Sequence, residues 1–281
     1  MSAQPVTPEL RRWIVAQAAA GHSPEVVLEA MKASGWDENV ALAALETTMS
    51  DRLTLVARKA EPPRPMPGQR ISAAAPRVRV EGHDVAVLMA LSQPRIVVFG
   101  SLLADEECAE LIALARTRLA RSETVETSTG ASEVNEARTS EGMFFLPAEF
   151  PVCARFEARI AALLEWPLEN GEGLQILRYG PGAEYKPHYD YFDPAEAGTP
   201  TILKRGGQRV ASLVCYLNAP EQGGATVFPE AGLEVAPIRG NAVFFSYDRP
   251  HPATQTLHGG APVEAGEKWV ATKWMREGRF E

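Results

Sequence analysis

The feature that most constrains the fold is a dense succession of short β-prone segments in the C-terminal half of the chain. Glycine and proline separate these segments, and few helical stretches interrupt them. Many short strands without alternating helices favour a sandwich or a barrel. We expect a double-stranded β-helix, the jelly-roll arrangement, because its open end gathers side chains from several strands. The strands are predicted near 173–180, 184–190, 209–217, 225–228, 233–236, 241–247 and 267–275.

The residues before these strands predict helices that buttress one sheet, so the fold class is mainly β with α. Apolar side chains follow one face of expected helices at 105–121 and 152–164. Alternation from Val78 to Val87 and the apolar run 96–99 indicate further strands. The stretch 122–141 is rich in Ser, Thr and Glu. Loops of that length are uncommon unless functional, so we expect a long mobile loop there.

The N-terminal residues 1–52 predict a separate three-helix module. Thr7-Pro8 and Ser23-Pro24 each place a capping residue before a proline at a first helical position. The segment Ser34-Gly35-Trp36 resembles the loop of ubiquitin-associated three-helix modules. Two interpretations stay open, a module that binds a partner protein and a helical appendage with a structural role. Residues 53–76 are predicted to be a proline-rich linker, and residues 77–281 the main domain.

Composition narrows the class of protein. The chain has 281 residues, and its 45% hydrophobic content is ordinary for a soluble globular protein. A net charge of −8 argues against a nucleic-acid partner, whose phosphates would be repelled. The three cysteines are distant from one another and lack metal-site spacing, which fits a reducing compartment. Neither a secretory signal nor a membrane-spanning apolar run is evident. We therefore expect a cytoplasmic protein without a membrane partner.

The motif His188-Tyr189-Asp190 carries the strongest chemical signal. In a strand, residues i and i+2 point to the same face, so this histidine and this aspartate can converge on one metal ion. A later histidine from a neighbouring strand would complete a two-histidine, one-carboxylate set with open positions, as in non-haem iron oxygenases. Spacing alone leaves His251 and His258 open as that third ligand. The alternative is a strand histidine hydrogen-bonded to a carboxylate.

Further motifs follow in a specific order. They are the segment 174–179 leading into Gly182 and Tyr185, and the segments 209–218, 223–229, 258–263 and 268–274. Together these motifs resemble the prolyl 4-hydroxylase family of Fe(II)/2-oxoglutarate-dependent dioxygenases, over roughly residues 94–277. The resemblance assigns His258, ten residues before Lys268, as the third ligand, and it makes residues 77–281 a dioxygenase domain.

The resemblance also implies a role for each candidate residue. Fe(II) would be held by His188, Asp190 and His258, with 2-oxoglutarate and O2 as cosubstrates and ascorbate as reductant. No catalytic residue is expected beyond the metal centre. For Tyr185 and Trp274 the alternative role is core packing. For Arg138 the alternative is a solvated position in the loop. The expected cosubstrate-binding residues are Tyr179, Lys268 and Ser212, and the expected substrate-binding residues are Tyr185, Trp274 and Arg138.

The implied reaction is hydroxylation of an aliphatic C–H bond coupled to oxidative decarboxylation of 2-oxoglutarate. The resemblance favours C4 of a prolyl residue in a protein or peptide. One alternative is the same chemistry on a free amino acid or a small metabolite. Another is an oxygen- or iron-responsive binding protein with little turnover, recruited through the N-terminal helices.

Overall fold

The computed structural model describes residues 4–59, 63–121, 123–125, 132–134 and 139–281. The chain divides into two compact units, Met1–Pro62 and Pro63–Glu281. Each unit buries apolar side chains of its own. In the described ranges, no helix combines the length and the apolar character needed to cross a membrane.

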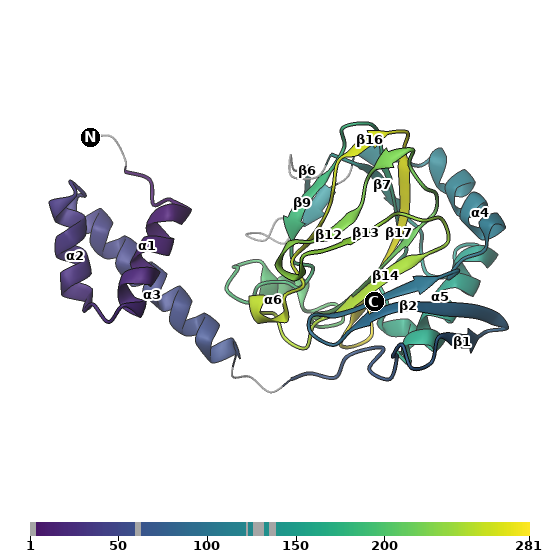
Figure 1. Cartoon of the computed structure of the whole chain (residues 1–281), viewed down its shortest axis with the longest axis horizontal. Helices are drawn as coiled ribbons and strands as arrows, with labels where there is room; N and C mark the ends of the chain where they lie inside the picture. Colours follow the sequence, from purple (N-terminus) through teal and green to yellow (C-terminus); the bar gives the residue numbers. More distant parts are fainter. Residues whose placement is uncertain (1–3, 60–62, 122, 126–131, 135–138) are drawn as a thin grey trace. The chain divides into compact units, whose positions relative to one another are not determined.

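The first unit contains the three expected helices, α1 (Pro8–Ala19), α2 (Pro24–Ala33) and α3 (Glu38–Lys59), drawn in purple and blue in Figure 1. Thr7 caps α1, because its hydroxyl accepts a hydrogen bond from the Leu10 amide at 3.3 Å. Helix α3 continues to Lys59, seven residues beyond the predicted end of the module at 52. No proline or glycine interrupts residues 53–59, so nothing in that segment ends the helix. The unit's core consists of Leu10, Ile14, Val27, Met31, Ala41, Ala44 and Leu45.

The second half of the predicted linker is packed against the second unit. The Gly68 amide donates to the Leu164 carbonyl at 2.8 Å. The Arg95 guanidinium donates to the carbonyls of Gly68 and Ile71, each at 2.6 Å. Ile71 itself belongs to the buried core. The prediction that the linker extends to residue 76 is therefore wrong for this part: prolines exclude a helix or a ladder, but they do not prevent packing.

A large and a smaller antiparallel sheet form the second unit, in a double-stranded β-helix (Figure 1). The predicted jelly roll is thus confirmed. The order in the large sheet is β1 (Arg77–Val80), β2 (His83–Leu91), β3 (Arg95–Gly100), β14 (Ala242–Ser246), β10 (Arg209–Tyr216), β17 (Lys268–Arg276), β8 (Gln175–Tyr179), β7 (Glu141–Phe144) and β4 (Ala120–Arg121). The order in the smaller sheet is β13 (Leu233–Val235), β12 (Thr226–Phe228), β15 (His258–Gly260) and β9 (Tyr185–His188).

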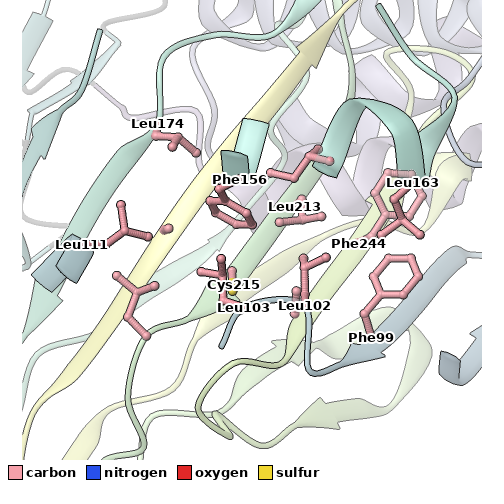
Figure 2. Close-up of a cluster of buried hydrophobic side chains, with 14 of the residues drawn as sticks. Phe99, Leu102, Leu103, Leu111, Phe156, Leu163, Leu174, Leu213, Cys215 and Phe244 are labelled. Atoms are coloured by element: carbon pink, nitrogen blue, oxygen red, sulfur yellow. The ribbon is translucent and has the colours of Figure 1, made fainter. Parts of the chain in front are cut away.

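Helices α4 (Asp105–Arg116) and α5 (Pro151–Leu164) cover the large sheet through the core shown in Figure 2, which contains Leu111 and Phe156 of the helices and Leu213 and Phe244 of the sheet. Helix α4 ends at Arg116 rather than at 121, because Ala120 and Arg121 pair with β7. The remaining short elements are β11 (Gln222–Gly223), β16 (Val263–Ala265), α6 (Thr199–Ile202) and the 3-10 helices Leu168–Asn170, Pro229–Ala231 and Pro252–Thr254.

The predicted loop at 122–141 contains regular structure. Strand β5 (Glu123–Val125) pairs antiparallel with β6 (Ser132–Val134). Thr124, Val125 and Val134 are β-branched residues that favour strands, a signal outweighed in the sequence by the surrounding polar residues. Arg138, a predicted substrate contact, lies outside the described residues.

Alternation along β17 places its side chains on the two faces of the large sheet. Trp269, Ala271 and Met275 belong to the core on the helix side. Lys268, Val270, Thr272 and Trp274 instead line a cavity between the sheets. This period of two is the pleat of an extended strand. It brings the predicted cosubstrate lysine into the interior of the jelly roll.

Candidate metal centre

The structure brings together the three side chains predicted as metal ligands. His188 ends β9 and His258 begins β15, and the two residues are directly paired across the smaller sheet. Asp190 follows two residues after His188. One ligand atom from each residue lies within 4.8 Å of the other two. The Asp190 carboxylate is 3.4 Å from His188 Nε2 and 3.5 Å from His258 Nε2.

Backbone carbonyls set the tautomer of both histidines. His188 Nδ1 lies 2.9 Å from the Lys186 carbonyl, and His258 Nδ1 lies 3.0 Å from the Thr256 carbonyl. A carbonyl oxygen only accepts, so each Nδ1 carries the hydrogen and each Nε2 keeps its lone pair. Both lone pairs then face an anionic carboxylate. Such a cluster is stable around a cation, and the donor set fits a divalent iron ion.

The protonation states also suit metal binding. Burial lowers the pKa of His258 to about 4, so its imidazole is neutral at neutral pH. Burial alone would raise the pKa of Asp190. Nearby positive charge, including that of Arg209, outweighs burial and holds that pKa below its ordinary value. The centre therefore presents a carboxylate and an uncharged imidazole without any proton having to be removed at neutral pH.

Ser212 lies at a different place from the predicted one. Its hydroxyl was expected beside Lys268, but it donates to Asp190 Oδ2 at 2.5 Å. The threonine hydroxyls on the cavity wall come from Thr226 and Thr272. Thr226 accepts a hydrogen bond from the Tyr216 hydroxyl at 2.8 Å. Thr226 belongs to the motif 223–229, but nothing in the sequence indicated its place on the cavity wall.

Lys268 gives the cavity a buried positive charge. The residue is 4% exposed, and no ion pair to its ammonium group exists in the described part of the chain. Its Nζ lies 5.6 Å from the centre of the Tyr179 ring, on the paired residue of β8. Burial lowers the pKa of Lys268 to about 8. A buried ammonium without a counter-ion is costly, so this end of the cavity is suited to a carboxylate ligand. Tyr179 lines the same cavity.

Two predicted substrate residues lie on the cavity wall beside the histidines. The Tyr185 ring stacks on His188, with centroids 3.8 Å apart and planes at 25°. Trp274 also lines the cavity, and the Arg209 guanidinium lies 4.0 Å from the centre of its ring. Trp274 Nε1 is buried and has no hydrogen-bond partner among the described residues. Trp274 is therefore both a packed side chain and part of the cavity wall.

His251 has a structural role outside the cluster. Its Nδ1 accepts a hydrogen bond from the Ala253 amide at 2.8 Å, which caps the 3-10 helix Pro252–Thr254. The residue is also buried rather than at the rim of the cavity. The geometry therefore agrees with His258 as the third member of the set.

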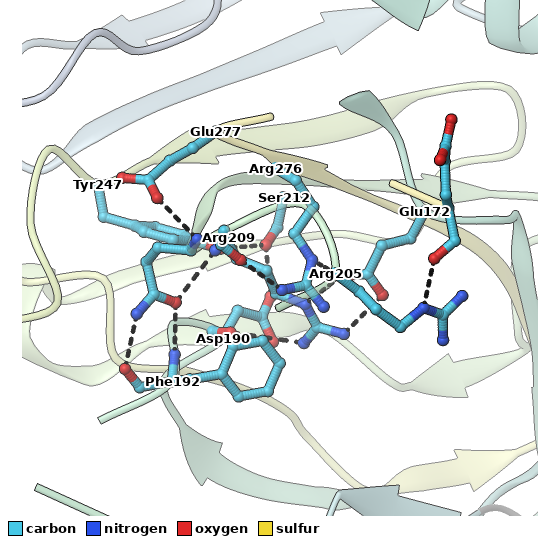
Figure 3. A network of polar contacts seen from close by, with 12 residues as sticks. Glu172, Asp190, Phe192, Arg205, Arg209, Ser212, Tyr247, Arg276 and Glu277 are labelled. Atoms are coloured by element: carbon cyan, nitrogen blue, oxygen red, sulfur yellow. Dashed lines mark hydrogen bonds and ion pairs between the residues drawn. The ribbon is translucent and has the colours of Figure 1, made fainter. Parts of the chain in front are cut away.

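A buried ion network behind the cluster was not predicted (Figure 3). Glu172 accepts hydrogen bonds from Arg209 Nε and Arg276 Nε, both at 2.6 Å. Burial opposes ionisation of Glu172, but the two guanidinium groups lower its pKa. Arg209 Nη1 also reaches the Asp190 carbonyl at 3.4 Å. The network thereby connects the cluster to β10 and β17, and single charged residues in the sequence did not reveal such a tertiary contact.

Comparisons with known proteins agree with this geometry. The model of the 2OG-Fe(II) oxygenase superfamily matches residues 174–276. Prolyl 4-hydroxylase 1 of Arabidopsis thaliana is 44% identical over 202 residues, which cover 66% of this chain and 69% of that relative. Prolyl 4-hydroxylase 5 of the same plant is 39% identical over 210 residues, which cover 67% and 70%.

A solved structure shows the same fold. The viral collagen prolyl hydroxylase of Paramecium bursaria Chlorella virus-1, determined as its 2-oxoglutarate complex, has a TM-score of 0.51 and 30% identity. The match covers 64% of this chain and 95% of that one. The paired histidines, the buried aspartate and the cavity lysine lie within the matched family region. The chain belongs to the prolyl 4-hydroxylase family of Fe(II)/2-oxoglutarate-dependent dioxygenases.

Proposed function

We propose that this protein hydroxylates C4 of a prolyl residue in a protein or peptide, with Fe(II), 2-oxoglutarate and O2. One observation carries the proposal: the cluster of His188, Asp190 and His258 shares a cavity with the ammonium group of Lys268, which is buried and has no ion pair with any described residue. A metal site at one end and a cation at the other match the two ends of a 2-oxo dicarboxylic acid. The names of the relatives support a prolyl substrate.

The residues of the chain bind and orient the reactants. Bound Fe(II), with O2 and 2-oxoglutarate, supplies the oxidising chemistry for an aliphatic C–H bond. Lys268 neutralises the distal carboxylate of 2-oxoglutarate, and Tyr179 packs beside it on the neighbouring strand. Lys268 is buried away from bulk water, which strengthens that ion pair. The proposal thus assigns positioning to the protein and the redox step to the cofactor set.

The aromatic wall supports a prolyl substrate. Tyr185 stacks on His188, and Trp274 lines the same cavity. A pyrrolidine ring packs well on aromatic side chains. This aromatic wall favours a prolyl ring as the substrate.

A free amino acid is the second candidate, and charge argues against it. Its carboxylate needs a cation, and among the described residues that line the cavity Lys268 is the one lysine or arginine. The cosubstrate already uses that charge. A peptide carries no such requirement, since its carbonyls need only hydrogen-bond donors.

The test is product analysis. The protein is incubated in air with Fe(II), 2-oxoglutarate and either a proline-rich peptide or free proline, and tandem mass spectrometry locates any added oxygen. We expect one added oxygen on prolyl residues of the peptide, together with succinate. The His258→Ala variant serves as the inactive control, and His251→Ala should remain active. Oxygen added to free proline alone would support the small-metabolite alternative, and absence of succinate with any substrate would support a binding protein.

Further proposals concern reductant, location and partners. We propose that ascorbate sustains repeated turnover, which omission of ascorbate from a long incubation tests. A cytoplasmic location is supported by Cys108, Cys153 and Cys215, which are buried and unpaired, and fractionation of cells tests it. Exposed Val26 and Leu42 on the helical unit support a partner-binding module, and the acidic net charge supports the absence of a nucleic-acid partner.

A further inference from the structure

Asp190 lacks the supports that hold the two histidines. His188 and His258 are paired strand residues, and backbone carbonyls hold their Nδ1 atoms. Asp190 lies beyond the end of β9, outside the named strands of the described chain. Its carboxylate is instead met from the opposite sheet by Ser212 of β10, whose Oγ lies 2.5 Å from Asp190 Oδ2.

A second hydroxyl supports the first. Tyr247 lies directly after β14, and its hydroxyl is 3.1 Å from Ser212 Oγ. Strands β14 and β10 are paired neighbours, with Ser246 opposite Ala211. All three side chains are buried, at 7% exposure for Asp190, 0% for Ser212 and 2% for Tyr247. Tyr247, Ser212 and Asp190 therefore form a chain of hydrogen bonds that is closed to water (Figure 3).

The direction of these hydrogen bonds follows from which groups carry a hydrogen. An ionised carboxylate only accepts hydrogen bonds, so the single hydroxyl hydrogen of Ser212 is committed to Asp190 Oδ2. The oxygen of Ser212 then acts as an acceptor, and Tyr247 must donate to it. The phenol stays protonated for this role, because burial raises its pKa well above the ordinary value and the Asp190 charge adds to that effect.

We propose that Tyr247 and Ser212 are positioning residues that hold the Asp190 carboxylate in the orientation that metal binding requires. The serine donates to Oδ2, which also lies 3.5 Å from His258 Nε2, and in this orientation Oδ1 lies 3.4 Å from His188 Nε2. Hydroxyl donors on a ligating carboxylate fix its rotamer and tune its affinity for the metal. This inference rests on the metal site of the proposed function and is independent of the substrate.

The test measures metal affinity rather than turnover. Metal-free protein is titrated anaerobically with Co(II), whose visible absorption reports binding to a histidine–carboxylate site. The variants are Ser212→Ala, Tyr247→Phe and the double variant. The matched control is Ser246→Ala, because Ser246 is another buried serine of the same sheet whose hydroxyl has no hydrogen-bond partner among the described residues.

We expect Ser212→Ala to weaken Co(II) binding by about 10- to 100-fold, the usual effect of losing a partner of a metal ligand. Tyr247→Phe should weaken it by a smaller factor, about fivefold, because one neutral hydrogen bond is lost. In the double variant the tyrosine change should add nothing, since its effect passes through the serine. Ser246→Ala should bind Co(II) as the unmodified protein does.

Two results would overturn the proposal. One is unchanged Co(II) affinity in Ser212→Ala. The other is a double variant whose loss equals the product of the two single losses, which is the behaviour of independent packing defects. If Ser212→Ala does not fold, unchanged affinity in Tyr247→Phe, which keeps the ring, overturns the proposal as well. If the tyrosine change adds nothing in the double variant but the protein hydroxylates no peptide, the proposed substrate is refuted and this inference is unaffected.

Discussion

The ammonium group of Lys268 is buried, and burial disfavours its charged form. In the unfolded chain its pKa is near 10.5, and burial lowers it to about 8 in the fold. The folded protein therefore binds fewer protons at this site, so the free energy of unfolding rises between pH 8 and pH 10.5. Below about pH 8 the full destabilisation is present. The residue is thus retained against stability, as expected for a ligand-binding charge.

The first prediction concerns the Lys268→Met variant without cosubstrate. Removing the buried charge should increase the free energy of unfolding at pH 7 by on the order of 3 kcal/mol, since each pKa unit corresponds to about 1.4 kcal/mol. Thermal unfolding of both proteins measures this change. Added 2-oxoglutarate should raise the Tm of the unmodified protein but not that of the variant. A variant less stable than the unmodified protein at pH 7 would contradict the argument.

The second prediction is the pH dependence of 2-oxoglutarate affinity. The proposed ion pair with the distal carboxylate requires the protonated form of Lys268, so the Kd should increase as pH rises above about 8, the lowered pKa of that lysine. The expected slope approaches about tenfold for each pH unit. Calorimetric titration with Mn(II) in the metal site, which avoids turnover, measures it. In Lys268→Arg the guanidinium stays charged, so a remaining slope of the same size would assign the effect to another group.

Residue periodicity explains which parts of the site the sequence predicts. The spacing of His188 and Asp190 is a local signal, and the interval from His258 to Lys268 is typical of the family. Both can be recognised in the sequence, and the structure brings the three ligand candidates together. The role of Ser212 was predicted wrongly. The alternation of the strand shows that the Ser212 side chain faces inward. It does not show that its hydroxyl donates to Asp190, which lies beyond the end of a strand. The register between opposite sheets decides that contact.

At the scale of elements, strand β17 connects the cavity to helix α5. On its outer face, Lys273 Nζ lies 2.5 Å from Glu157 Oε1, and both side chains are buried. Glu157 also accepts a hydrogen bond from the Ala148 amide at 2.8 Å. The ion pair therefore holds the helix against the strand that carries Lys268 and Trp274.

The third prediction tests this ion pair. Lys273→Met leaves Glu157 buried without its partner, which should decrease the free energy of unfolding by about 3 to 5 kcal/mol. Adding Glu157→Leu should recover most of that loss, because an apolar pair can replace a buried ion pair. Urea unfolding of the single and double variants measures both steps. If the double variant is no more stable than Lys273→Met, the loss has another origin.

Most strands were predictable because glycine and proline end them and alternation marks their faces. The predicted 209–217 and 267–275 correspond to Arg209–Tyr216 and Lys268–Arg276. Several elements of two or three residues were not predicted, including His258–Gly260 as a strand. Such short strands have little propensity of their own. Strand β15 forms because β9 and β12 pair with it on either side.

At the scale of the whole molecule, the chain combines two units that each have their own core. Composition predicted a helical segment, a proline-rich stretch and a β domain. The ends of these parts were less predictable, because α3 continues to Lys59 and Ile71 packs into the second unit. Helix propagation and apolar packing decide such boundaries, and a change in composition marks them only approximately.

The fourth prediction tests whether the two cores are energetically separate. Ile14 is fully buried in the core of the helical unit, whose members all lie between Leu10 and Leu45. Ile14→Asp buries a carboxylate there, which costs several kcal/mol, more than so small a core can supply. We expect loss of helical circular dichroism from this unit, while anaerobic Fe(II) and 2-oxoglutarate still produce their charge-transfer absorption. The exposed Val26→Asp change is the control for added charge. Loss of that absorption in Ile14→Asp, but not in Val26→Asp, would show that the helical unit supports the metal centre.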